Sequence, residues 1–209
     1  MVNWLYVIVL GIIAGLVSSI FDVPLWILLI VFIVLAIAKI LHMYYIAFFS
    51  TDMNKVKKYI IKNKKDPFMN FLLVVESGTM EQEIEASDKV IAHYKQPTMK
   101  NTYEMNRAIR LEDFERAHEF ADKLMKTPYG PYGKALIAAS LGNRVEAKSY
   151  SLKSDWMEAA IDAELALKEN NKAAFEKYSK KAIEGTKGIQ RFLFIHGFNK
   201  SIKEHNLHQ

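Results

Sequence analysis

Cysteine is absent from the 209-residue chain. This absence excludes disulfide bonds, thiolate metal sites and cysteine nucleophiles. The nine glycines form no phosphate-binding loop, and the His-Glu-x-x-His spacing of zinc enzymes does not occur. We therefore predict no catalytic residues, no cofactor and no metal, so we do not expect the chain to be an enzyme.

Charge is almost missing from the first fifty residues, which contain only Asp22 and Lys39. Residues 66–209 hold 21 basic and 21 acidic side chains, so the net charge of +5 lies entirely in residues 51–65. That segment has one acidic residue and six lysines: Lys55, Lys57, Lys58, Lys62, Lys64 and Lys65. Because the polar part is neutral, the basic balance does not indicate a nucleic-acid partner.

Two long apolar runs occupy residues 1–50, from Trp4 to Ile20 and from Leu25 to Phe49. Each is close to the ~20 residues that cross a bilayer as a helix. Pro24 disfavours a continuous helix between them, so we predict a hairpin of two spans, about 3–21 and 25–46. A cleaved signal peptide is the alternative, but it requires a basic start and a small-residue cleavage site. The first residues carry no basic side chain, and Ser18-Ser19-Ile20 fits such a site poorly.

The lysines that follow the second run predict the orientation of the hairpin. Basic residues beside a span remain on the cytoplasmic side, so we expect a multi-pass protein of the cell membrane with both termini in the cytosol. The basic juxtamembrane segment 51–65 would contact anionic lipid head groups, at roughly 1 kcal/mol per lysine. Alternatively, its lysines act only as a topology signal.

Gly11, Gly15 and Ser19 recur every four residues and share one face of the first predicted helix. Small residues allow another helix to approach closely. That helix could be the second span, another membrane protein or a second copy of the chain. Lys39 could mark a polar path within the membrane, but its distance from the end of the run favours snorkelling to the surface.

Residues 66–204 are rich in helix signals and are predicted to form a cytosolic helical domain, followed by a tail at 205–209. Asp66-Pro67 is typical of a helix start, and Pro128 to Gly133 is predicted to be the clearest break. Within that break, Tyr129 and Tyr132 form a candidate partner-binding loop, or they pack the turn against a neighbouring helix. Glu81, Glu83 and Glu85 are interpreted as a solvated face. In the tail, His205 and His208 could bind a metal only if the tail is helical.

A weak internal repeat supports an array of helical hairpins, which makes the predicted fold class all-α. Residues 112–117, 142–147 and 169–174 each contain a polar turn followed by an alanine, at positions 117, 147 and 174. Periods near 30 residues are typical of helical arrays. Each short helix is amphipathic and can bury its apolar face only against its neighbours.

Residues 110–184 resemble the tetratricopeptide-like repeat superfamily. Phe114, Ala117 and Leu124 match the second-helix pattern of that superfamily, as do Ala174 and Tyr178. The first-helix pattern of Trp, Leu-Gly and Tyr is absent. The resemblance implies a concave groove that binds a peptide or a partner helix, without identifying groove residues.

These features together predict a membrane-anchored scaffold or adaptor that binds an unidentified protein through its cytosolic helical domain. Anchoring would raise the effective concentration of a weak binder beside its partner. The alternative is an accessory subunit of a larger transport, secretion or envelope-synthesis complex, assembled or oligomerised through its membrane helices. A membrane-bound enzyme is a third, less favoured interpretation.

Overall fold

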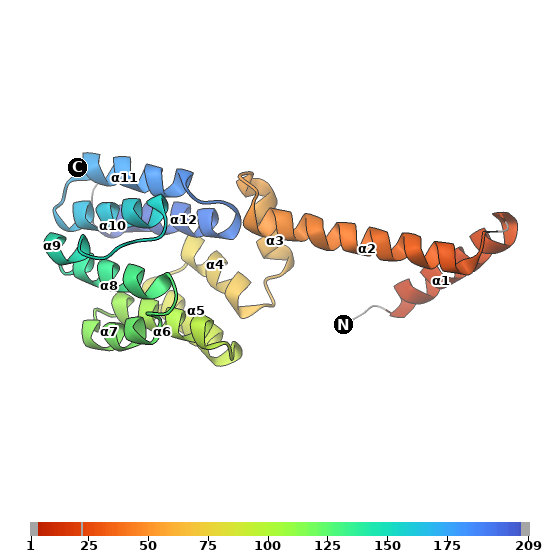
Figure 1. The fold of residues 1–209 in the computed structure, drawn as a ribbon, viewed down its shortest axis with the longest axis horizontal. Helices are drawn as coiled ribbons and strands as arrows, with labels where there is room; N and C mark the ends of the chain where they lie inside the picture. The colour runs from red at the N-terminus through yellow and green to blue at the C-terminus, as the bar shows by residue number, and fades with distance from the viewer. Residues whose placement is uncertain (1–3, 22, 206–209) are drawn as a thin grey trace. The chain divides into compact units, whose positions relative to one another are not determined.

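The computed structural model describes residues 4–21 and 23–205, which contain helices and no strand. The prediction of an all-α protein is thus confirmed for the described residues. The chain divides into two compact units, Met1–Tyr45 and Ile46–Gln209. Figure 1 labels the helices of both units.

The first unit contains helix α1 (Trp4–Phe21) and most of helix α2 (Leu25–Phe48). Val23 and Pro24 separate them, and the Ser18 Oγ donates a hydrogen bond to the Val23 carbonyl at 2.8 Å. The 24 residues of α2 extend for about 36 Å, which exceeds the ~30 Å of a bilayer core. Within the described residues, α2 is the one helix that is both long and apolar enough to cross a membrane.

The described part of the second unit contains ten helices. All of them except α9 have at least ten residues. Their bounds are α3 (Met53–Lys62), α4 (Pro67–Ser77), α5 (Met80–His93), α6 (Pro97–Arg110), α7 (Phe114–Lys123), α8 (Tyr129–Ser140), α9 (Arg144–Ala147), α10 (Asp155–Lys168), α11 (Lys172–Glu184) and α12 (Gly188–Glu204). Consecutive helices pack against one another through most of the stack, and α8 contacts α10 directly. Residues 66–204 are thus helical, as predicted, with short connections between the helices.

Helix α3 joins the second unit instead of forming a separate juxtamembrane segment. Asp52 caps it, because its side chain accepts hydrogen bonds from the N–H groups of Asn54 and Lys55. Val56 and Ile60 are fully buried in a core cluster that also contains Leu72 and Phe192. The lysine-rich sequence is amphipathic, and its apolar side therefore belongs to the folded domain.

The predicted break at Pro128–Gly133 is wrong in position, because α8 begins at Tyr129. Proline is compatible with the first turn of a helix, where backbone N–H groups have no intrahelical partner. Gly130 is buried, and a Cβ there would lie 2.6 Å from the backbone of Met125. This close approach explains the glycine, and the actual break is the shorter segment between α7 and α8.

Three hairpins, α6–α7, α8–α9 and α10–α11, turn in the same way. At each turn one residue adopts a positive φ: Glu112 (57°), Gly142 (75°) and Asn170 (52°). The next residue caps the following helix with its side chain and donates its N–H to an alanine carbonyl five residues earlier. These bonds are Asp113 to Ala108 (2.9 Å), Asn143 to Ala138 (2.9 Å) and Asn171 to Ala166 (2.8 Å).

The three caps show the true register of the repeat, since they lie at positions 113, 143 and 171. Four residues after the cap, Ala117 and Ala147 are buried in the first two hairpins. In the third hairpin the equivalent position is Phe175, which is 1% exposed, and Ala174 is only partly buried. The predicted alignment of Ala174 with the other two alanines is therefore wrong by one residue.

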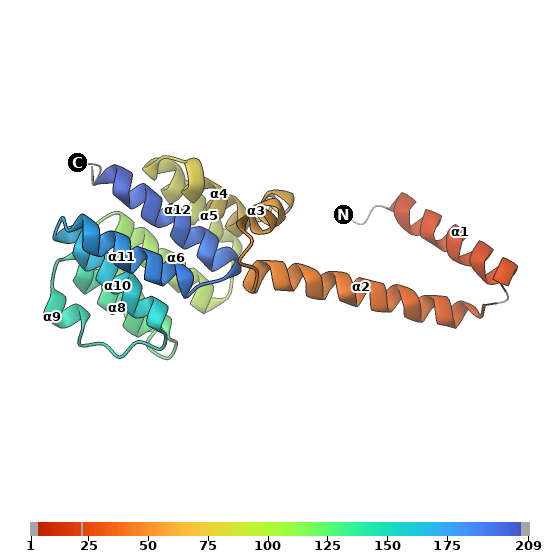
Figure 2. The same ribbon diagram turned by 90° about the horizontal axis from the view of Figure 1, so that it is seen from above.

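Helix α12 closes the stack. It packs against α11, its neighbour in sequence, and against α3 and α4 at the other end of the unit. Figure 2 shows α12 running across the unit between the side that holds α4 and α5 and the side that holds α10 and α11. Helix α12 therefore links the two ends of the unit.

The equivalent turns predict opposite effects for two substitutions. Glu112→Gly relieves a positive φ that costs a non-glycine residue about 1 kcal/mol, so it should stabilise the protein by roughly 0.5–1 kcal/mol. Gly142→Ala introduces that cost and should destabilise by about 1 kcal/mol. Thermal unfolding of the full chain in detergent, followed by circular dichroism, measures both. Shifts of the same sign would contradict the equivalence of the two turns.

Candidate functional site

A cavity of about 700 Å³ lies in the second unit, where α6, α8, α10 and α12 meet the end of α2. Most of its lining is apolar, and five helices contribute aromatic rings: Phe68, Tyr103, Tyr132, Trp156 and Phe194. Ala47, Phe48 and Phe49 form a further part of the wall. Along the sequence, the lining of the cavity therefore starts two residues after Tyr45, the last residue of the first unit.

Gly188 brings the start of α12 against this wall. Its φ is +55°, and a Cβ at this position would overlap the carbonyl group of Ala47. Its N–H donates a hydrogen bond to the Ser50 carbonyl at 2.8 Å. Only glycine combines this backbone conformation with such a close approach, so the sequence at 188 determines how the cavity is enclosed.

The aromatic rings inside the cavity pack on one another. Tyr132 and Trp156 meet edge to face with their centroids 5.6 Å apart, and Trp156 lies 5.4 Å from Phe194. Phe68 packs in the same manner on Tyr103, at 6.1 Å. Burial raises the pKa of both the Tyr103 and the Tyr132 phenols, so both remain neutral. The interior is uncharged and suits an apolar ligand.

The polar side chains of the lining are few. Thr102, Asn106 and Gln190 supply neutral groups, and the latter two are solvent-exposed. Lys187, also exposed, is the one charged side chain among the described residues that line the cavity. An apolar interior with one cation beside it fits a ligand that has an apolar body and an anionic end.

The structure places both predicted tyrosines at this cavity. They lie in the first turn of α8 and not in a loop. Tyr129 is 42% exposed, whereas Tyr132 is half-buried against Trp156. The sequence therefore identified part of the lining, but it missed Tyr103, Trp156 and Phe194. These three come from helices whose convergence depends on tertiary packing, and no local pattern distinguishes them from core residues.

The six lysines of the basic segment are all exposed on α3 and the residues that follow it. Lys57 forms an ion pair with Glu76 at 2.7 Å, and Lys55 approaches Asp52 at 3.6 Å. Lys58 and Lys62 present their charge to solvent from α3, whose opposite side is in the core, and Lys64 and Lys65 do so from the turn that follows. Their role at a lipid surface stays a prediction.

The small-residue face of α1 is open in the described part of the first unit. A Cβ built on Gly11 or on Gly15 would meet no heavy atom within 4 Å, and Ser19 is exposed. Within this unit, the structure does not bring α2 against the two glycines.

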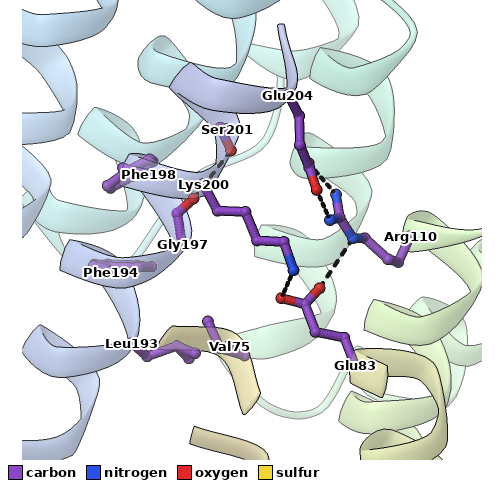
Figure 3. A pocket seen from close by; sticks show the side chains of 10 residues that line it. All are labelled: Val75, Glu83, Arg110, Leu193, Phe194, Gly197, Phe198, Lys200, Ser201 and Glu204. Carbon is purple, nitrogen blue, oxygen red and sulfur yellow. Dashed lines mark hydrogen bonds and ion pairs between the residues drawn. The ribbon is translucent and has the colours of Figure 1, made fainter. Parts of the chain in front are cut away.

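A network of charged side chains holds the last part of α12, as Figure 3 shows. Glu83, which is 8% exposed, accepts hydrogen bonds from Lys200 Nζ at 2.6 Å and from Arg110 Nε at 3.2 Å. Arg110 also forms two bonds to Glu204, at 2.9 and 2.5 Å. These bonds lower the pKa of the Glu204 carboxyl. The interpretation of Glu83 as part of a solvated face is thus wrong, while Glu81 and Glu85 are indeed exposed.

The described residues contain no group of three histidine, aspartate or glutamate side chains that could hold a metal ion. His208 lies outside them, so the predicted pair His205 and His208 remains a prediction. Comparisons of the chain with protein-family models, curated proteins and solved structures returned no match. The fold and cavity define the class, an all-α protein that joins a membrane-length apolar helix to a helical domain with an aromatic cavity.

The network around Glu83 can be compared with an ordinary surface pair on the same helix. Glu83→Gln leaves Arg110 and Lys200 without their shared carboxylate in a largely buried position, and we expect a loss of about 2–3 kcal/mol of stability. Glu85→Gln removes only the exposed pair with Lys89 and should change stability little. Chemical or thermal unfolding of the full chain in detergent measures both. Equal effects would show that the network does not hold α12.

Proposed function

We propose that the chain is a membrane-anchored adaptor whose helical domain binds another protein close to the membrane surface. One observation carries this proposal: α2 is a membrane-length apolar helix whose last turn, at Ala47 and Phe48, lines an aromatic cavity of the folded unit. Aromatic side chains supply most of the binding energy at protein interfaces. Anchoring confines such a weak binding site to the neighbourhood of membrane partners.

We further propose that α1 and α2 form a two-span hairpin with both termini in the cytosol. The 18 residues of α1 extend for about 27 Å, close to the thickness of a bilayer core. Pro24 immediately precedes α2, and the short connection between Phe21 and Leu25 suits a turn at one membrane surface. The exposed lysines of α3 support a cytosolic second unit, and they would hold it against anionic head groups.

The helical domain is proposed to be a tetratricopeptide-like array in which α12 fills the inner side. The three equivalent turns of α6–α7, α8–α9 and α10–α11 support this assignment. Because α12 covers the inner side, we place the protein-binding surface at the rim of the cavity. Tyr129 is its exposed aromatic residue on α8.

Site-specific photocrosslinking in native membranes tests the adaptor proposal. A p-benzoylphenylalanine in place of Tyr129 should form a discrete adduct with another protein. The same replacement at Val145, which is 85% exposed on α9 and does not line the cavity, is the matched control. Identical adducts from both positions, or lipid adducts alone from position 129, would contradict a protein-binding rim.

The alternative function is an accessory subunit that assembles through α1. The open face at Gly11 and Gly15 favours it. Replacing both glycines with leucine should abolish co-purification of the partner complex, because bulk prevents close helix approach. Ile13→Phe adds similar bulk to the opposite face of the same helix and should have no effect. Retention of all partners in the Gly11→Leu, Gly15→Leu variant would exclude this alternative.

A further inference from the structure

The cavity also has the composition expected of a lipid site. We propose that it holds one acyl chain of an anionic membrane phospholipid, with the head group beside Lys187. This inference rests on the proposed membrane anchoring of α2, and it goes beyond the adaptor function. Four observations support it: the position of the cavity along the chain, its size, its lining and its single charge.

The first observation is the position of the cavity along the chain. The apolar unit ends at Tyr45, and Ala47 already lines the cavity. Two residues of helix advance the chain by about 3 Å. If α2 crosses the bilayer, Tyr44 and Tyr45 lie in the interfacial zone where tyrosine is enriched, and the wall of the cavity begins there. Along the chain, the lining of the cavity therefore follows directly on the proposed membrane span.

Size argues against a docked helix. One turn of an α-helix with its side chains is about 10 Å wide and 5.4 Å long, so it fills roughly 400 Å³. The cavity, at about 700 Å³, would accept less than two turns. A flexible hydrocarbon chain adapts to the same space without bringing backbone N–H and C=O groups into an apolar interior.

The apolar lining explains why a hydrocarbon chain, and not water, would occupy the cavity. Water in this cavity would meet mostly rings and methyl groups, because Met105, Leu136, Ile189 and Leu193 complete the wall between the aromatic side chains. Apolar cavities bind apolar guests in preference to water. An acyl chain moves here from the bilayer core at little cost, so selectivity among lipids must come from the head group.

The charge identifies that head group as anionic. Lys187 is exposed, and it is the one charged residue of the described lining. It precedes Gly188, whose backbone is fixed against Ala47 and Ser50, so the lysine is anchored beside the part of the wall that Ala47 forms. The exposed lysines of α3 add to the positive potential of the same unit.

Photolabelling from within the bilayer tests the proposal on the full-length chain. The protein is reconstituted into phosphatidylcholine vesicles that carry phosphatidylglycerol with a diazirine on one acyl chain. After irradiation and digestion, mass spectrometry should find label on peptides with Tyr103, Trp156 and Phe194 as well as on α2. Label confined to α1 and α2 would leave the anchor intact and overturn the lipid site.

Substitutions that fill or obstruct the cavity distinguish labelling inside the cavity from labelling at the surface of the domain. Leu136→Trp fills the interior and should abolish label on α6, α10 and α12, as should Gln190→Trp, which obstructs the exposed mouth and spares the core. Val145→Trp on α9 is the control and should label like the unaltered chain. Persistent cavity label in both filled variants, with circular dichroism unchanged, would overturn the proposal.

Charge reversal tests the head group. Lys187→Glu should reduce labelling by the phosphatidylglycerol probe about fivefold, the effect of roughly one cation near an anionic surface. Labelling by a phosphatidylcholine probe should not fall. Lys180→Glu, at an exposed position of α11, should leave both unchanged. Equal labelling by the two probes, or protein adducts in native membranes from a photoreactive residue at position 136, would contradict an anionic lipid as the occupant.

Discussion

The packing of α12 across the second unit is the interaction on which the other features depend. Its first half supplies Ile189, Leu193 and Phe194 to the cavity, and Phe192 to the core cluster shared with α3 and α4. Its second half is held by ion pairs to Glu83 and Arg110. Apolar burial places the helix, and the charged network fixes its register, because a buried carboxylate between two cations tolerates little displacement.

This closure determines which surfaces remain for binding. Helix α12 packs against α11 and against α3 and α4, so this part of the unit is closed by a segment of the same chain. The space left beside α12 is small, aromatic and next to the residues that leave the apolar unit. A site of this kind suits a single side chain or a lipid tail at the membrane surface better than a long peptide.

Much of the helical pattern was predictable from sequence, because it depends on local chemistry. Asp66-Pro67 starts α4 as expected, and its carboxylate accepts hydrogen bonds from Phe68 and Met69. The polar turns near 112, 142 and 170 were also found. The position of α8 was missed because Pro-Tyr-Gly is a turn signal in water, whereas here Gly130 allows close contact with the preceding loop.

The tertiary features could not be predicted in the same way. Glu83 has the same local surroundings as Glu81 and Glu85, and it becomes a buried partner because Arg110 and Lys200, 27 and 117 residues later, reach it in the fold. The cavity likewise requires residues from α2 to α12 to converge. The lysine-rich sequence of 51–65 likewise gives no sign that Val56 and Ile60 of α3 are buried in the core of the domain.

The central claim is that the first unit crosses the membrane twice and leaves the second unit in the cytosol. The absence of cysteine provides a clean background for single-cysteine labelling in intact cells. With a membrane-impermeant maleimide, Val23→Cys in the connection should react from outside, and Lys180→Cys on α11 should react only after permeabilisation. Labelling of Lys180→Cys in intact cells, or protection of Val23→Cys until the membrane is opened, would contradict the account.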